Sequence, residues 1–221
     1  MHDAAILFDL DGTLADSAPG IIQAMRHAME SVGVEPAPPE LLALDLGPPP
    51  AVILARIGVP AALIDDAVAA YRRRYMAEDY RNAVLYPGIR ESLGSLRGRG
   101  ILATATAKRI PTATHFLTHH ELLRAFDLVG GSSDLIREKA DIIADTIRRL
   151  THRSGVVYAP ERSVMIGDRH SDITGGRAHG LRTIGVTWDY GSREELEATA
   201  PDAIVDSPAE LDRTVRQLLA A

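Results

Sequence analysis

Short apolar runs alternate with amphipathic patterns along most of this 221-residue chain, and this alternation restricts the fold more than any other feature. The runs lack the apolar–polar alternation of a half-exposed strand, so each predicts a strand buried on both faces. They are Ala4–Phe8, Ile101–Ala105, Phe126–Val129, Val164–Ile166 and Thr183–Val186, with a weaker one at Ala203–Val205. The helix patterns between them are Gly88–Arg99, Pro111–Leu123, Lys139–Leu150 and Ser171–His179. This order indicates an α/β fold, a Rossmann-like parallel sheet with helices on both faces.

One stretch, from about Asp16 to Ala83, contains helix patterns and no convincing strand. Asp16-Ser17-Ala18-Pro19 is typical of a helix start, because a polar cap is followed by an early proline. A second long helix is predicted at Ala61–Met76. We therefore expect an α/β core built from residues 1–15 and 84–221, with an α-helical insertion of residues 16–83.

The composition excludes several classes of protein. Without cysteine the chain has no disulfide scaffold, no thiolate metal site and no cysteine nucleophile. A net charge of −6 without a basic run argues against nucleic acid as a partner, and no apolar run has the length of a membrane span. The start Met1-His2-Asp3-Ala4 lacks the basic residues of a secretory signal, which predicts a cytoplasmic protein.

The basic residues are unevenly divided between arginine and lysine. The 24 basic positions hold 22 arginines and two lysines, Lys108 and Lys139. A lysine kept in such a chain marks either a position that needs a compact ammonium group or a chance retention. The composition alone does not separate these two interpretations.

Two acidic pairs follow predicted strands. Asp9 and Asp11 come directly after the first run, and residues two apart in an extended segment face the same side. Two such carboxylates repel each other unless a cation or a proton lies between them. Asp168 and Asp172 follow the run Val164–Ile166. Oxygen ligands suit Mg²⁺, so we predict Asp9, Asp11 and Asp168 as metal ligands, with Asp172 orienting a ligand or water from behind them.

A hydroxyl and an ammonium group complete the candidate site. Thr106 ends the run Ile101–Ala105, and Lys139 begins a predicted helix. Together they suit phosphate oxygens, because one donates a hydrogen bond and the other neutralises charge. Each residue also has an interpretation without a functional role: Thr106 as an ordinary strand-end threonine and Lys139 as a surface lysine. Thr104 is the alternative to Thr106 as the phosphate-binding hydroxyl.

These motifs resemble the haloacid-dehalogenase superfamily, in its phosphatase branch. Four elements match in order over almost the whole chain: Asp9-x-Asp11-Gly12-Thr13, Thr106, Lys139 and Gly167-Asp168-x-x-x-Asp172. The helical insertion is similar to the α-helical cap of that family. Tyr86-Pro87-Gly88, Lys139-Ala140-Asp141 and Ile184-Gly185-Val186 resemble the phosphoglycolate-phosphatase-like subgroup.

The resemblance implies a role for each residue. Asp9 attacks phosphorus and forms an aspartyl-phosphate, and Asp11 protonates the leaving alcohol and then deprotonates water. Mg²⁺ bridges Asp9, Asp168 and the phosphoryl group, and the backbone carbonyl of Asp11 is a further ligand. The phosphoryl oxygens are held by Thr106, Lys139 and the N–H groups of Asp11, Gly12 and Ala107.

We therefore expect an Mg²⁺-dependent phosphatase of a small phosphorylated metabolite, a monomer or homodimer, with 2-phosphoglycolate the leading substrate. A nucleotidase, a pyrophosphatase and a sugar-phosphate phosphatase or mutase are the alternatives, although Ile21 stands where mutases carry a histidine. Residues 15–84 contain no lysine, which excludes a phosphonatase that works through a cap Schiff base. A non-catalytic phosphate-binding protein is the alternative from another class, and it has no need of Asp11.

Overall fold

The computed structural model describes residues 3–43 and 46–220. Residue contacts divide the chain into two compact units, one formed by the segment up to Ala15 and the segment from Leu85 onward, the other by Asp16–Val84. The predicted boundary between residues 83 and 84 lies one residue from this division. Met1, His2, Leu44 and Asp45, which the predicted segments 1–15 and 16–83 include, lie outside the described residues, as does Ala221.

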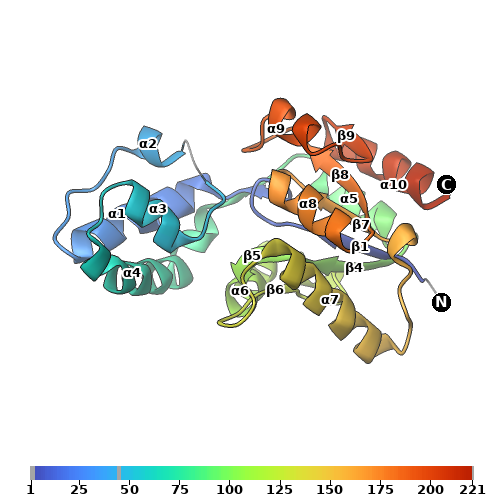
Figure 1. The fold of residues 1–221 in the computed structure, drawn as a ribbon, viewed down its shortest axis with the longest axis horizontal. Helices are drawn as coiled ribbons and strands as arrows, with labels where there is room; N and C mark the ends of the chain where they lie inside the picture. Colours follow the sequence, from blue (N-terminus) through green and yellow to red (C-terminus); the bar gives the residue numbers. More distant parts are fainter. Residues whose placement is uncertain (1–2, 44–45, 221) are drawn as a thin grey trace. The chain divides into compact units, whose positions relative to one another are not determined.

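The first unit is built on a five-stranded sheet whose strands run parallel in the order β4-β1-β7-β8-β9 (Figure 1). The strands are β1 (Ala5–Phe8), β4 (Ile101–Thr104), β7 (Val164–Gly167), β8 (Arg182–Val186) and β9 (Ala203–Val205). Every residue of β1 and β7 is buried, as expected for strands covered on both faces. The predicted α/β fold is confirmed.

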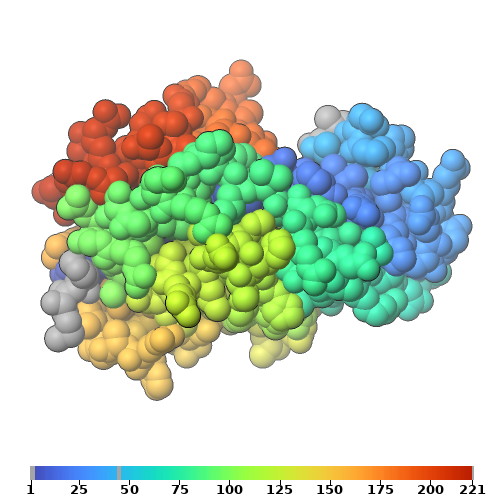
Figure 2. Space-filling model, turned by 180° about the vertical axis from the view of Figure 1, so that it is seen from behind, coloured from blue at the N-terminus to red at the C-terminus, as the bar shows by residue number. Residues whose placement is uncertain are grey.

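Helices cover both faces of this sheet. They are α5 (Ile89–Leu96), α6 (Ile110–His119), α7 (Lys139–Ser154), α8 (His170–Ala178), α9 (Arg193–Ala198) and α10 (Leu211–Ala220), with 3-10 turns η3 (Leu123–Ala125), η4 (Pro160–Arg162) and η5 (Pro208–Glu210). In Figure 1 α7 and α8 lie in front of the sheet and α5 behind it; Figure 2 shows α5 and α6, green and yellow-green, from that rear side. Ile142 and Ile143 of α7 pack against Leu7, Ala103 and Met165 in one buried cluster.

The predicted strand Phe126–Val129 is wrong. Only Leu128 forms a bridge, to Ala103, and no strand is assigned there. The run still follows the edge of β4, because the Asp127 N–H donates to the carbonyl of Leu102 at 2.8 Å and the Thr104 N–H donates to the carbonyl of Leu128 at 3.2 Å. The ring of Phe126 packs edge-on against that of Phe8 at 6.0 Å. Two further short strands that the sequence patterns do not predict pair with each other, β5 (Thr106–Arg109) and β6 (Gly131–Ser132).

The second unit is helical. Its elements are α1 (Ala18–Ser31), α2 (Pro39–Ala43), α3 (Pro50–Arg56), η1 (Ala61–Leu63), α4 (Ile64–Ala77) and η2 (Asp79–Asn82). α1 packs along α4, and buried Asp79 is held by Arg74 at 3.1 Å. The short strands β2 (Ala15–Asp16) and β3 (Val84–Leu85) pair with each other where the chain passes between the units. Within residues 3–43 and 46–220, each helix is too short or too polar to span a membrane.

His120, just after α6, makes the stability of the first unit depend on pH. Its ring lies 4.6 Å from that of Phe116, and its Nε2 is buried with no hydrogen-bond partner among the described residues. Burial, reinforced by the charges of His119 and Arg90, lowers the pKa of His120 from 6.5 to about 4. The unfolded chain therefore binds a proton first as the pH falls, so the stability that the neutral ring contributes is complete above pH 6.5 and is lost toward pH 4.

We expect urea denaturation to show this loss when wild type is compared with His120→Gln. The free energy of unfolding of wild type, relative to the variant, falls as the pH is lowered from about 7 to about 4, because only wild type carries the titrating ring. Taking the difference between the two proteins cancels the other titrating groups. A difference that stays constant over this range contradicts the assignment.

Candidate active site

Three neighbouring strands bring the predicted site residues to one edge of the sheet. Asp9 follows β1, and its N–H continues the ladder to Ile166 of β7 at 2.9 Å. Asp168 follows β7 directly, and Thr106 follows β4 after Ala105, whose N–H donates to Phe8 at 2.7 Å. The carboxyl ends of parallel strands are where α/β sheets bind ligands.

Gly12 allows the loop after β1 to lie against Asp168. Its φ is +73°, and a Cβ at this position would lie 2.3 Å from Asp168 Oδ2. The next residue, Thr13, donates its hydroxyl to Asp168 Oδ1 at 2.9 Å. The N–H of Gly12, which the resemblance assigns to phosphate binding, donates to the carbonyl of Ala15 at 3.0 Å within the loop in this structure.

Lys139 connects the two acidic pairs. Its Nζ lies 2.8 Å from Asp9 Oδ2 and 2.7 Å from Asp172 Oδ1, and it donates to the carbonyl of Ala105 at 3.0 Å. Burial alone would lower the pKa of Lys139, but the carboxylates of Asp172 and Asp9 outweigh it and raise that pKa above its ordinary value. The ammonium group is therefore charged at any physiological pH.

Lys108 is the site residue that the sequence motifs missed. Its side chain is 7% exposed, and its Nζ lies 2.8 Å from Asp11 Oδ2. The two lysines of the chain therefore hold the two carboxylates of Asp9-Leu10-Asp11, one each. Their scarcity among 24 basic residues was the signal that pointed to both, and the motif pattern used only Lys139.

The carboxylates present suit a divalent cation. Oxygens of Asp9, Asp168 and Asp172 lie within 4.8 Å of one another, and all three residues are buried. Asp168 Oδ2 is buried and has no hydrogen-bond partner in the described part of the chain. With Asp11, four carboxylates face two ammonium groups, which leaves two negative charges for Mg²⁺ to balance.

The same crowding shows in the acid–base properties of two of these residues. Burial, with the nearby charges of Asp172 and Asp9, raises the pKa of Asp168 well above its ordinary value. Burial also raises the pKa of Asp172 to about 6, although Lys139 opposes it. Asp172 Oδ2 accepts the N–H of Arg169 at 3.1 Å, so Asp172 is tied to Lys139 on one side and to the β7 loop on the other. A bound cation would relieve this repulsion.

The structure gives the two candidate threonines different surroundings. Thr104 accepts the N–H of Gly130 at 3.0 Å and donates to its carbonyl at 2.7 Å, so its hydroxyl anchors that loop. Thr106 is buried at the strand edge, where its Oγ1 accepts the N–H of Lys108 at 3.3 Å. Ala107 is exposed, and its carbonyl accepts the hydroxyl of Ser132. We therefore favour Thr106 over Thr104 as the phosphate-binding hydroxyl.

Comparison with known proteins agrees with this geometry. Residues 6–186 match the haloacid dehalogenase-like hydrolases. Tyrosine-protein kinase PtkA of Mycobacterium tuberculosis is 36% identical over 202 residues, 90% of this chain and 67% of that protein. A 5'-nucleotidase of Pseudomonas aeruginosa is 35% identical over 91% of this chain and 92% of its own. A phosphoglycolate phosphatase of Pseudomonas putida is 30% identical over 91% of this chain and 75% of that protein.

A solved structure extends the likeness to the fold. The haloacid dehalogenase-like hydrolase of Streptococcus pneumoniae superimposes with a TM-score of 0.85 at 32% identity, covering 96% of this chain and 97% of that one. The resemblance to this family that the motifs predict is thereby confirmed. This chain belongs to the haloacid dehalogenase-like hydrolase family and is one of its phosphoric monoester hydrolases.

Proposed function

We propose that this protein is an Mg²⁺-dependent phosphatase that works through an aspartyl-phosphate on Asp9. The observation that carries the proposal is the pair of neighbouring carboxylates, each held by the buried side chain of its own lysine, next to an oxygen of Asp168 that has no hydrogen-bond partner among the described residues. A protein that only binds phosphate has no use for a second carboxylate held beside the first. Asp9 is kept in a fixed orientation, since Leu10 N–H donates to Oδ1 at 2.7 Å and Lys139 holds Oδ2.

Each residue of the site then has one task in two successive displacements. Asp9 forms a bond to phosphorus as the bond from phosphorus to the leaving oxygen breaks, and Asp11 gives that oxygen a proton. Water then attacks phosphorus, Asp11 takes its proton, and Asp9 is released with inorganic phosphate. Thr106 and Lys139 stabilise the phosphoryl oxygens, over which the charge spreads. Asp9 and Asp168 would hold Mg²⁺, which supplies Lewis-acid stabilisation of the same charge.

We further propose 2-phosphoglycolate as the substrate and the unit Asp16–Val84 as the cap that selects it. Several relatives are named phosphoglycolate phosphatase, and the relative with 92% of its length matched is named 5'-nucleotidase, which makes a nucleoside monophosphate the second candidate. A panel of phosphate esters ranked by kcat/KM tests this proposal. We expect 2-phosphoglycolate to rank first; a nucleoside monophosphate ranked above it would overturn the substrate and leave the chemistry intact.

The relatives named tyrosine-protein kinase favour one further possibility, transfer of the phosphoryl group to a hydroxyl instead of water. The aspartyl-phosphate is common to both outcomes, and only the acceptor differs. Incubation with ATP labelled in its terminal phosphate separates them, because phosphotyrosine survives alkali and an aspartyl-phosphate does not. Label that remains on the protein after alkali supports the kinase-like transfer, and label found only as free phosphate supports the phosphatase.

We expect Mg²⁺ to be required for turnover and Ca²⁺ to inhibit, because Ca²⁺ takes more ligands in a looser geometry. The protein's one tryptophan offers a readout independent of activity. Trp188 Nε1 donates to the carbonyl of Thr13 at 3.1 Å, and Thr13 donates to Asp168. Saturable change of Trp188 fluorescence with Mg²⁺, absent in Asp168→Asn, is the expected result. Full turnover after exhaustive chelation would contradict the metal requirement.

A further inference from the structure

Lys108 forms an ion pair with Asp11, and contacts with neighbouring residues fix the backbone of Lys108. It belongs to β5, and its N–H donates to Thr106 Oγ1 at 3.3 Å. Its carbonyl lies so close to β6 that a Cβ on Gly131 would approach it to 2.5 Å, which only glycine permits. The backbone of Lys108 is therefore fixed, and its 7%-exposed side chain reaches Asp11 from a rigid base.

The two oxygens of Asp11 differ in their surroundings. Oδ2 is bound by the Lys108 ammonium group at 2.8 Å. Oδ1 is buried and has no hydrogen-bond partner in the part of the chain that the structure describes. A carboxyl group with one oxygen tied down can rotate little, so its second oxygen keeps one direction. A buried polar atom left without a partner is costly unless a ligand completes it.

We propose that Lys108 is a positioning residue for proton transfer: by holding Asp11 Oδ2 it presents Asp11 Oδ1 to the leaving oxygen of the substrate. This rests on the proposed function, in which Asp11 is the acid. The proton moves from Asp11 Oδ1 to the leaving oxygen as the phosphorus–oxygen bond breaks and Asp9 binds phosphorus. In the second step the same Oδ1 accepts the proton of the attacking water.

Leaving groups of different basicity separate this role from a general effect on binding. An alkyl phosphate such as 2-phosphoglycolate needs a proton on its leaving oxygen, whereas the dinitrophenolate of 2,4-dinitrophenyl phosphate leaves without one. We expect Lys108→Met to lower kcat/KM for the alkyl ester roughly 10²-fold and for the dinitrophenyl ester less than about threefold. A merely structural role would lower both by the same factor.

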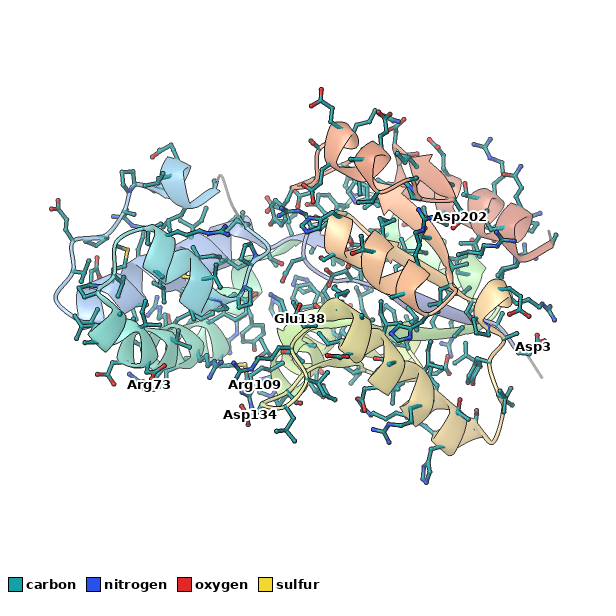
Figure 3. All side chains as sticks on the ribbon, viewed as in Figure 1. Asp3, Arg73, Arg109, Asp134, Glu138 and Asp202 are labelled. Carbon is teal, nitrogen blue, oxygen red and sulfur yellow. The ribbon has the colours of Figure 1, made fainter. Side chains whose placement is uncertain are left out.

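Arg109 is the matched control, because it carries the neighbouring positive charge on β5. Its Nη2 donates to the exposed carboxylate of Asp134 at 3.1 Å, and both residues are labelled in Figure 3. Arg109→Met is expected to leave the ratio of the two kcat/KM values unchanged. Lys108→Arg, which keeps a cation on β5, is expected to restore part of the ratio. Thermal unfolding of each variant establishes that it is folded.

A double-mutant cycle with Asp11→Asn completes the test. If Lys108 acts through Asp11, the double variant is no slower on the alkyl ester than Asp11→Asn alone. Equal losses of Lys108→Met on both esters, or a double variant that loses the product of the two single effects, would overturn the positioning role. If Asp11→Asn itself spares the alkyl ester, the proposed function fails in its assignment of the acid, which is a different outcome.

Discussion

Asp9→Asn is expected to abolish turnover and to leave the protein folded. The amide is nearly isosteric with the carboxylate but is a far poorer nucleophile, so the first displacement fails. Steady-state assays with the best ester of the panel, at saturating Mg²⁺, measure the loss. Turnover within tenfold of wild type would point to direct attack by water instead.

Stability provides the control for this variant. Asp9 adds to the repulsion that raises the pKa of both Asp168 and Asp172, so removing its charge relieves the buried cluster. The loss of the 2.8 Å ion pair with Lys139 opposes this, and Asp172 keeps that lysine paired. We therefore expect the melting temperature of the metal-free variant to equal or exceed that of wild type.

Lys139→Arg is expected to lose most of kcat/KM although it keeps the charge. The ammonium group fits among the oxygens of Asp9, Asp172 and Ala105 with its side chain 6% exposed. Its stem is packed as tightly, since a Cβ on Gly175 of α8 would approach Lys139 Cγ to 3.0 Å. A planar guanidinium is wider, and a displacement of about 1 Å costs on the order of 10²-fold in rate.

Lys139→Ala is expected to lose at least as much activity, together with stability. It leaves Asp172, which is fully buried, without its counter-charge, and breaking such a pair costs on the order of 3 kcal/mol. Lys108→Arg is the comparison and is expected to be milder, because Asp11 is 26% exposed and leaves more room. If Lys139→Arg keeps near-full activity while Lys108→Arg is inactive, the phosphate-binding lysine is Lys108.

The sequence predicts the sheet well because buried parallel strands have a local signature. The runs Ala4–Phe8, Val164–Ile166 and Thr183–Val186 coincide with β1, β7 and β8, because a short apolar segment at the centre of a parallel sheet buries both of its faces and pairs its backbone with two neighbours. Phe126–Val129 is similarly apolar and is not assigned as a strand, because its pairing with β4 is limited to the bridge from Leu128 to Ala103 and the hydrogen bonds beside it. A local pattern reports burial, and only the tertiary structure decides how the backbone is paired.

Some residues of the candidate site can likewise be predicted from the local sequence, whereas others depend on the tertiary structure. Asp9 and Asp168 can be predicted because each directly follows a strand, and Asp11 because it lies two residues after Asp9, so the topology brings all three to one edge. Lys108 could not be placed, because its reach to Asp11 depends on the pairing of β5 with β6, two strands of four and two residues. The hydrogen bond from the N–H of Gly12 to the carbonyl of Ala15 likewise depends on the path of the loop from Leu10 to Ala15, which the sequence pattern does not predict.

The aspartyl-phosphate is the central claim, and Asp11→Asn with 2,4-dinitrophenyl phosphate tests it most directly. This ester needs no acid, so Asp9 is phosphorylated, but water lacks its base and the intermediate accumulates. Rapid mixing is predicted to release one dinitrophenolate per protein in a burst before slow turnover. Borohydride reduction of the quenched protein is predicted to convert Asp9 to homoserine. Product formation without a burst, and an intact Asp9 throughout, would contradict the account.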